Sequence, residues 1–178
     1  IEPQQQGIKK VFGKMVGTAR GGLAVTWPFP IGDIEIVNIK EQNVSIGDFW
    51  MFETPEDKTK DLRSRRIMWE GLRPGYDGAL LTGDRNLLHV KLNCTYVVND
   101  PLAYRTNIKD LEGTMRTVLC GAAIRAAAGR TADGIQRTEQ KQFLKDVTRM
   151  AQDELDSLLK SSDADAEGIL IKGVLMTS

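Results

Sequence analysis

Few residues of this chain could perform chemistry, and the first of them is its single histidine, His89. This residue falls on the more polar face of an alternating segment, between Leu88 and Val90. A catalytic triad or a zinc site needs partner side chains at defined spacing. The chain contains no Cys-x-x-Cys and no His-x-x-x-His pattern. We therefore interpret His89 as a surface or packing residue.

An acidic run, Asp163-Ala164-Asp165-Ala166-Glu167-Gly168, is similar to the start of a calcium-binding loop. Such a loop needs a bidentate glutamate at its twelfth position, which Val174 occupies here. A solvated acidic turn is the better interpretation. A metal-dependent hydrolase that uses Asp163, Asp165 and His89 is the competing enzymatic hypothesis, and tight stoichiometric metal binding would support it.

Motifs for nucleotides or nucleophilic catalysis are also absent from the sequence. The glycines occur at turns and not in a G-x-G-x-x-G or G-x-x-x-x-G-K-[ST] loop, and no serine lies in a G-x-S-x-G elbow. The two cysteines, Cys94 and Cys120, fall on apolar faces of a predicted strand and a predicted helix. This placement favours buried reduced thiols and leaves a disulfide open. We predict no catalytic residue, no cofactor and no metal.

The charge balance narrows the possible partners. Lys and Arg number 24, Asp and Glu also number 24, and the formal net charge is zero. This balance argues against a nucleic-acid partner and against strong electrostatic docking on anionic lipid. The sequence contains no run of about 18 apolar residues, the length with which a helix could cross a membrane. The chain opens on Ile1 without a methionine, so we expect it to be a piece of a longer protein.

The strongest structural signal is an alternating segment that precedes Asn99-Asp100-Pro101. A period of two predicts a strand with one buried face, and proline ends it because it has no N–H for the ladder. The apolar face consists of Leu88, Val90, Leu92, Cys94, Tyr96 and Val98.

Helical spacing of apolar residues predicts two helices, at 110–128 and 138–160. Asp110 suits the N-cap of the first and Gly129 its end. A single helical turn is expected at 131–135, short strands within 7–46, and a last strand at 169–176. The apolar stripe of the second helix is Phe143, Val147, Met150, Ala151, Leu155 and Leu158.

Residues 47–81 combine aromatic segments with a mixed-charge stretch. We predict a hairpin-like insertion of two aromatic strands here, because a structureless loop of this length is unusual. Its aromatic side chains are candidates for interaction, although packing on the main sheet is favoured over an exposed contact patch. These candidates are Phe49, Trp50, Phe52 and Trp69.

The segment 23–31 is apolar and aromatic, and its prolines prevent it from adding freely to a sheet. Tryptophan suits a membrane–water interface because it has an apolar body and one polar group. A buried proline-rich connection between strands is the alternative that we favour slightly. The candidates for a membrane interface are Leu23, Trp27, Phe29 and Ile31.

Several motifs follow one another along the chain: Gln6-Gly7-Ile8, Trp27-Pro28-Phe29-Pro30, Thr82-x-Asp84-x-Asn86, Asp100-Pro101-x-x-Tyr104, the helix 111–128 and the strand 168–174. In this order they resemble the SPFH family, also called Band 7 or prohibitin/stomatin. The Trp-Pro-Phe-Pro form is most like the HflK branch of bacterial membrane-protease regulators. The resemblance implies an α/β fold of the α+β type, with a twisted, mostly antiparallel sheet, two packed helices and an insertion at about 47–81 in a single domain, 1–178.

The resemblance also implies a role. It predicts a non-catalytic, membrane-associated scaffold that assembles into large rings or cages and regulates a membrane-bound AAA protease. The implied partners are further copies of the chain, a paralogous SPFH protein, that protease and membrane lipid. The implied location is the inner membrane of a bacterium, with this domain outside the cytoplasm. A stomatin- or flotillin-like organiser of lipid microdomains that regulates channels is the alternative.

Overall fold

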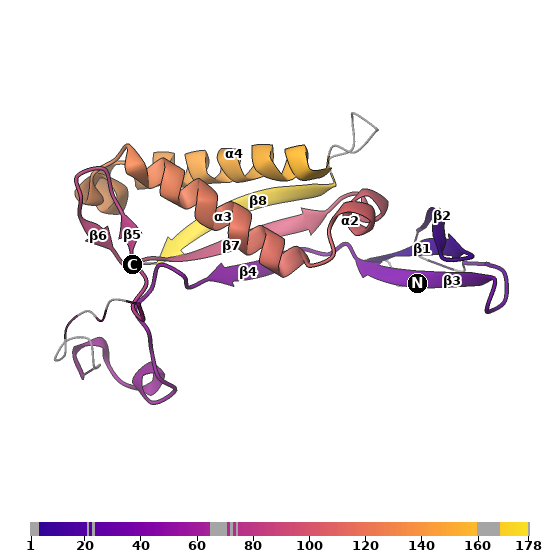
Figure 1. Cartoon of the computed structure of the whole chain (residues 1–178), viewed down its shortest axis with the longest axis horizontal. Coiled ribbons are helices and arrows are strands. Elements are labelled where there is room, and N and C mark those ends of the chain that lie inside the picture. The colour runs from indigo at the N-terminus through magenta and orange to yellow at the C-terminus, as the bar shows by residue number, and fades with distance from the viewer. Residues whose placement is uncertain are drawn as a thin grey trace.

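The computed structural model describes residues 4–20, 22, 24–64, 71, 73, 75–159 and 168–177. Figure 1 shows an elongated molecule, with a small N-terminal sheet at one end of the long axis and two helices over a second sheet. The predicted fold class, antiparallel strands with packed helices, is confirmed. The strands form separate sheets, however, and not the one sheet that the sequence suggested.

The N-terminal sheet consists of β1 (Gln5–Val11), β2 (Lys14–Ala19) and β3 (Gly32–Asn38) in the order β2-β1-β3. Both pairings are antiparallel, and the β1–β2 register shifts between Lys9 and Lys10, where Val16 of β2 has no partner in β1. Ile8 is fully buried and Val37 nearly so. With so few buried side chains, this sheet depends on its neighbours for stability, since small isolated sheets are marginal in water.

The larger sheet has the order β4-β7-β8, with β4 (Gln42–Ile46), β7 (Lys91–Val98) and β8 (Ile169–Thr177) all antiparallel. Its central strand is the segment whose alternation is clearest in the sequence. Cys94 pairs with Val44 on one side and Val174 on the other. The predicted apolar face of this segment is buried throughout. The segment is divided, because β6 (Leu87–Leu88) pairs instead with β5 (Leu80–Leu81) in a separate short hairpin.

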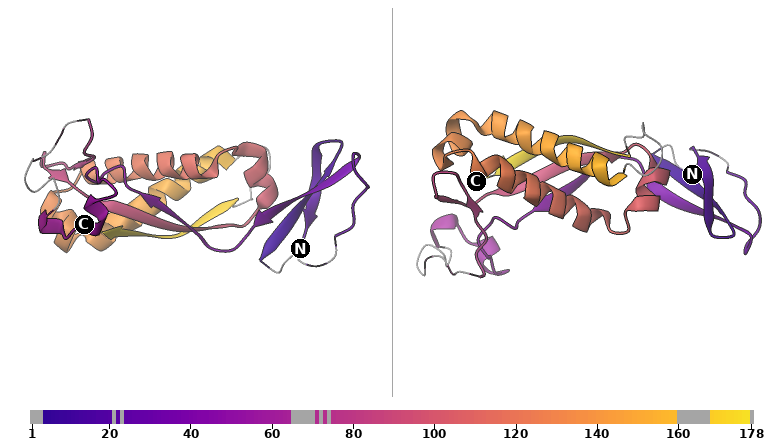
Figure 2. Two further views of the ribbon diagram at one scale, coloured as in Figure 1. Left: turned by 90° about the horizontal axis from the view of Figure 1, so that it is seen from below. Right: turned by 45° about the horizontal axis from the view of Figure 1, so that its top comes forward.

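Two helices cover one face of this sheet, as Figure 2 shows from below. The first, α3 (Leu111–Ala128), begins and ends where the sequence predicted. At its start the Asp110 carboxylate accepts a hydrogen bond from the Gly113 N–H (3.1 Å), and at its end Gly129 is the C-cap. The second, α4 (Gln140–Leu159), buries Phe143, Val147, Ala151 and Leu155 completely. A π-helical turn, Gly134–Thr138, connects them.

The prediction of the buried stripe of α4 is wrong for one residue. Leu158 is 51% exposed, whereas Leu159 is 5% exposed and contacts the core. A step of four residues from Leu155 keeps the side chain on the buried face at the end of the helix.

A short helix, α2 (Pro101–Asn107), occupies the place where the sequence predicted only the end of a strand. The Asp100 carboxylate accepts hydrogen bonds from the N–H groups of Leu102 (2.9 Å) and Ala103 (3.2 Å), and proline occupies the first turn. An ion pair from Arg105 links this helix to the N-terminal sheet. Arg105 and Lys10 both bind the Glu35 carboxylate on β3, the latter at 2.6 Å. These two cations, Lys10 above all, lower the pKa of Glu35.

The first strand of the expected aromatic hairpin, at 49–52, is wrong, and the second, at 67–69, lies outside the described residues. Residues 47–64 contain two short 3₁₀ turns, Asp57–Thr59 and Leu62–Ser64, and no strand. Other bonds occupy the backbone at 49–52, because the Trp50 N–H donates to the Gly47 carbonyl (3.0 Å) and the Phe52 N–H donates to the Asp77 carboxylate (2.8 Å). Such bonds compete with strand pairing.

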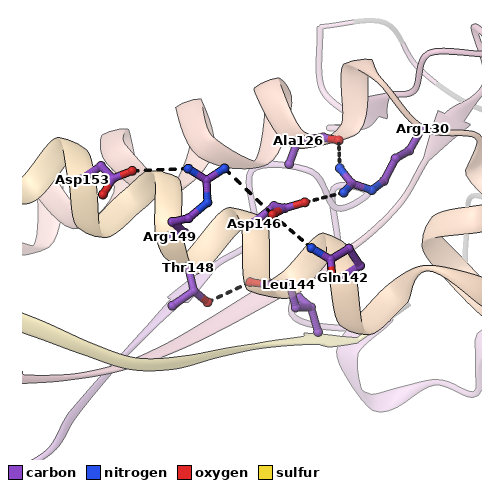
Figure 3. Close-up of polar contacts among 8 residues, drawn as sticks. All are labelled: Ala126, Arg130, Gln142, Leu144, Asp146, Thr148, Arg149 and Asp153. Carbon is purple, nitrogen blue, oxygen red and sulfur yellow. Dashed lines mark hydrogen bonds and ion pairs between the residues drawn. The ribbon is translucent and has the colours of Figure 1, made fainter.

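Arg130 ties the end of α3 to the start of α4 (Figure 3). Its guanidinium donates to the Ala126 carbonyl (2.6 Å) and to the Asp146 carboxylate (2.5 Å). Its Nε lies 3.4 Å from the Glu139 carboxylate, which is an ion-pair distance without hydrogen-bond geometry. The hydrogen bond from Arg130 is the main cause of a lowered pKa at Asp146.

The lowered pKa of Asp146 predicts an acid-dependent part of the stability. A carboxyl group with a folded-state pKa below its unfolded value stabilises the fold above the unfolded pKa of about 4, and this contribution is lost as pH falls through the lower value. The stability difference between the wild type and Asp146→Asn should therefore be constant near neutrality and shrink below about pH 4. Urea unfolding across pH measures it, with Asp153→Asn as a control for loss of one charge on α4. A difference that does not change with pH would contradict the assignment.

Both cysteines are free, as the sequence favoured. Burial raises the pKa of Cys94 to about 12, and burial together with the Asp48 carboxylate raises that of Cys120 to about 11. Because the thiolate is the reactive form, we expect neither to react rapidly with a disulfide reagent at pH 8 in the native protein, and both to react in denaturant. Rapid labelling of the native chain would contradict this, and Cys94→Ser and Cys120→Ser would identify the reactive thiol.

Candidate membrane-facing surface

Exposed apolar side chains gather at the end of the N-terminal sheet that points away from the helices. Phe29 is 89% exposed, Phe12 77% and Trp27 66%. Large apolar groups this exposed in proximity usually mark a contact surface for a partner or a membrane. We call this surface the apolar tip and define it as Phe12, Val16, Val25, Trp27, Phe29 and Ile31.

The turn between β1 and β2 places Phe12 at the tip. Phe12 and Gly13 have φ angles of +49° and +77°, the left-handed conformation that a two-residue hairpin turn requires. A bulky residue at positive φ is unfavourable, and the first position of such a turn usually carries asparagine or glycine. The Phe12 N–H donates to the Ile31 carbonyl (2.8 Å). This bond holds the hairpin turn beside the turn that carries Phe29.

The segment 24–28 packs against the start of β3 because Gly32 has no side chain. A Cβ atom on Gly32 would lie 2.5 Å from the Trp27 carbonyl oxygen and 2.6 Å from the Thr26 hydroxyl. The same segment borders a cavity of about 480 Å³, whose other walls come from β1 and β2. Its lining is mainly apolar and includes Val11, Val16, Val25, Trp27 and Pro28.

Replacing Gly32 by alanine should displace this segment. The Cβ meets backbone that cannot rotate away, so we expect a loss of about 1–3 kcal/mol in the free energy of unfolding. Gly17→Ala is the matched control, because a Cβ at Gly17 in β2 meets nothing within 4 Å. Thermal unfolding of both variants measures the effect. Equal stability of Gly32→Ala and Gly17→Ala would contradict the proposed close approach.

Three of the four residues that the sequence singled out for a membrane interface lie at the tip. Trp27 and Phe29 are largely exposed, and Ile31 is 36% exposed, so a buried proline-rich connection is excluded for them. Leu23 lies outside the described residues. Sequence reasoning missed Phe12, Val16 and Val25. The signal for Phe12 was present, since Phe-Gly stands where a hairpin turn usually has Asn-Gly.

The aromatic candidates of the segment 47–81 differ in their exposure to solvent. Phe49 is 7% exposed and belongs to the core, so it cannot present a surface to a partner. Phe52 is 49% exposed. Trp69 lies outside the described residues. Trp50 is partly buried, its indole N–H donates to Glu53 (3.0 Å), and the Lys91 ammonium lies 4.6 Å from the centre of its ring.

Trp50 forms part of the wall of a second cavity, of about 620 Å³. Tyr76, Phe52 and Lys58 also line it, and Lys91 binds Glu53 across it at 3.3 Å. The charged pair Glu53 and Lys91 and the aromatic groups make the described lining of this cavity resemble an ordinary protein surface more than a substrate site.

The residues considered for catalysis do not converge. The Nδ1 of His89 lies 2.8 Å from the Gly78 carbonyl oxygen, and because a carbonyl only accepts, this nitrogen carries the proton. Within the described ranges, no group of three His, Cys, Asp or Glu side chains is placed to hold a metal ion. Asp163 and Asp165 lie outside those ranges.

Comparison with known proteins identifies the chain's family. No curated protein matches it significantly. Among the residues that the structure describes, no helix has both the length and the apolar character needed to cross a bilayer. The family model described as SPFH domain / Band 7 family matches residues 1–164, which include every described helix and every described strand except β8. The chain therefore belongs to the SPFH domain / Band 7 family, whose members are generally membrane-associated scaffolds.

Proposed function

We propose that this chain is a non-catalytic scaffold domain that meets the bilayer through the apolar tip. The observation that carries the proposal is the exposure of Trp27 and Phe29 beside Phe12, on two turns joined by a backbone hydrogen bond. Aromatic side chains favour the interface between lipid and water. Neutral lipid suffices for this contact, because the chain has no net charge to attract an anionic surface.

Fluorescence of Trp27 tests this proposal. The Trp50→Phe/Trp69→Phe background leaves Trp27 as the only tryptophan of the chain. With neutral phosphatidylcholine vesicles, its emission should shift to the blue, and lipids brominated near the headgroup should quench it. Emission that stays typical of water at saturating lipid would exclude insertion of the tip.

The assembly that we propose for the whole protein is a large ring or cage, formed with a paralogous SPFH protein, that regulates a membrane-bound AAA protease. The likeness of Trp27-Pro28-Phe29-Pro30 to the HflK branch supports this proposal. The same likeness supports placing the protein at the inner membrane of a bacterium, with this domain outside the cytoplasm.

Affinity purification of the full-length protein from membranes in mild detergent, followed by mass spectrometry, tests the assembly. Recovery of a paralogue together with an AAA protease is the expected result. Recovery of channels or lipid enzymes without a protease would favour the stomatin- or flotillin-like alternative. This outcome is independent of whether the tip inserts into lipid.

A further inference from the structure

A groove runs between α4 and β8, at the edge of the larger sheet, where Figure 1 shows the helix lying along the strand. The groove has a volume of about 610 Å³. Its floor is apolar and includes Leu144 from the helix and Leu170 and Val174 from the strand. Thr148 also lines it, and its hydroxyl is turned back to the Leu144 carbonyl at 2.8 Å (Figure 3).

The strand that borders the groove has an open edge. Within the described residues, β8 pairs only with β7, and it ends the order β4-β7-β8. At the start of β8, the Gln152 side chain takes the place of a neighbouring strand: its oxygen accepts from the Ile171 N–H and its nitrogen donates to the Ile169 carbonyl, both at 2.9 Å. From 172 to 177 no described side chain binds the strand backbone. An open edge of this kind can pair with another extended segment.

The rim of the groove is cationic. Lys141, Lys145 and Arg149 follow one another at intervals of four residues along α4, and Lys172 faces them from β8. Like charges four residues apart repel one another on a helix, so this row of cations destabilises α4 when no anion is bound nearby. Arg149 is partly neutralised by Asp153 (3.6 Å) and Asp146 (4.0 Å), as Figure 3 shows. Among the described residues, no carboxylate lies within ion-pair distance of the three lysines.

We propose that this groove binds an acidic, extended segment of a partner protein, which adds to the sheet as a strand beside β8. The open edge supplies backbone hydrogen bonds. Alternate side chains of an added strand point towards the helix layer, where the lysines attract carboxylates and Leu144 contacts apolar groups. A basic segment would be repelled by the same rim. The site is far along the molecule from the apolar tip, so it does not depend on contact with lipid.

A fluorescent nine-residue peptide, the length of β8, tests the groove in the absence of lipid. It carries glutamate at alternate positions and valine or threonine at the others. One control peptide has lysine in place of glutamate, and a second has proline at alternate positions, which removes N–H donors. Fluorescence anisotropy should show saturable binding of the acidic peptide, weakened by salt, and no binding of either control.

The matched protein variants are Lys141→Glu/Lys145→Glu, in the groove, and Lys40→Glu/Lys109→Glu, which makes the same charge change at exposed positions elsewhere. The groove variant should bind the acidic peptide at least about tenfold more weakly, while the control variant binds it like the wild type. Circular dichroism checks that both are folded.

Three results would overturn the proposal. The first is equal binding of the acidic and proline peptides, which would leave only non-specific charge attraction. The second is a salt-sensitive dimer of the chain that the groove variant abolishes, which would make a second copy the occupant. The third is binding to anionic vesicles that the groove variant alone loses, which would make the groove a lipid site. Because all peptide measurements omit lipid, their failure leaves the proposed role of the tip untouched.

Discussion

Replacing Phe143 by alanine is expected to lower the free energy of unfolding by about 3–5 kcal/mol. Phe143 is fully buried in the first turn of α4, and its N–H donates to the Glu139 carbonyl at 2.8 Å. Truncation removes the transfer free energy of the ring and leaves a cavity between helix and sheet. A loss of this size is a large fraction of a typical domain's stability, about 5–15 kcal/mol.

Leu158→Ala is the matched control for Phe143, because it truncates an apolar residue of the same helix at a 51% exposed position. Its effect should stay within about 0.5 kcal/mol. Denaturant unfolding of both variants, with the slope of the transition compared, measures the two effects. A large loss of stability from Leu158→Ala, or a small one from Phe143→Ala, would contradict the observation that Phe143 lies on the buried face of α4 and Leu158 on the exposed face.

The double substitution Trp27→Ser/Phe29→Ser should weaken binding to neutral vesicles by at least about 100-fold. Each large apolar side chain contributes about 1.5–3 kcal/mol when it leaves water, and about 1.4 kcal/mol corresponds to a factor of ten. Both side chains are more than half exposed in the free chain, so the substitution removes little packing. Sedimentation with vesicles measures the partition coefficient.

Phe52→Ser controls for the general loss of an exposed aromatic group. Phe52 is 49% exposed and lies in the segment 47–64, away from the tip. The Phe52→Ser variant should bind vesicles as the wild type does. Equal weakening by both substitutions would show that lipid contact is spread over the surface and is not a property of the tip.

The sequence predicted those elements whose signals are local. The Asp110 cap, the Gly129 end and the alternation from Leu88 to Val98 each depend on neighbouring residues, and each is present in the structure. The helix α2 was missed although Asp100 and Pro101 are common N-cap and first-turn residues. They stand directly after a strong strand pattern, and proline was interpreted only as its end.

The surfaces could not be predicted to the same extent, because they depend on contacts between distant segments. Residue types identified Trp27 and Phe29 as candidates, but their exposure follows from the bond between Phe12 and Ile31 and the close approach at Gly32. The groove at β8 depends on the strand order, which no local pattern contains. At 49–52, the bonds from the Trp50 N–H to Gly47 and from the Phe52 N–H to Asp77 take the place of the strand that the aromatic pattern predicted.

The pairing of β7 with β8 has a consequence for how the chain folds. Lys91 pairs with Thr177 and Val98 with Ile169, so the central strand finds its second neighbour only after α2, α3, the π-helical turn and α4 have been synthesised. Such distant pairing closes a long loop and slows folding. Until β8 arrives, one edge of β7, the described strand with the most buried side chains, is open to other chains. During the same interval, the apolar face of α4 that packs against β8 in the finished fold also lacks its strand partner.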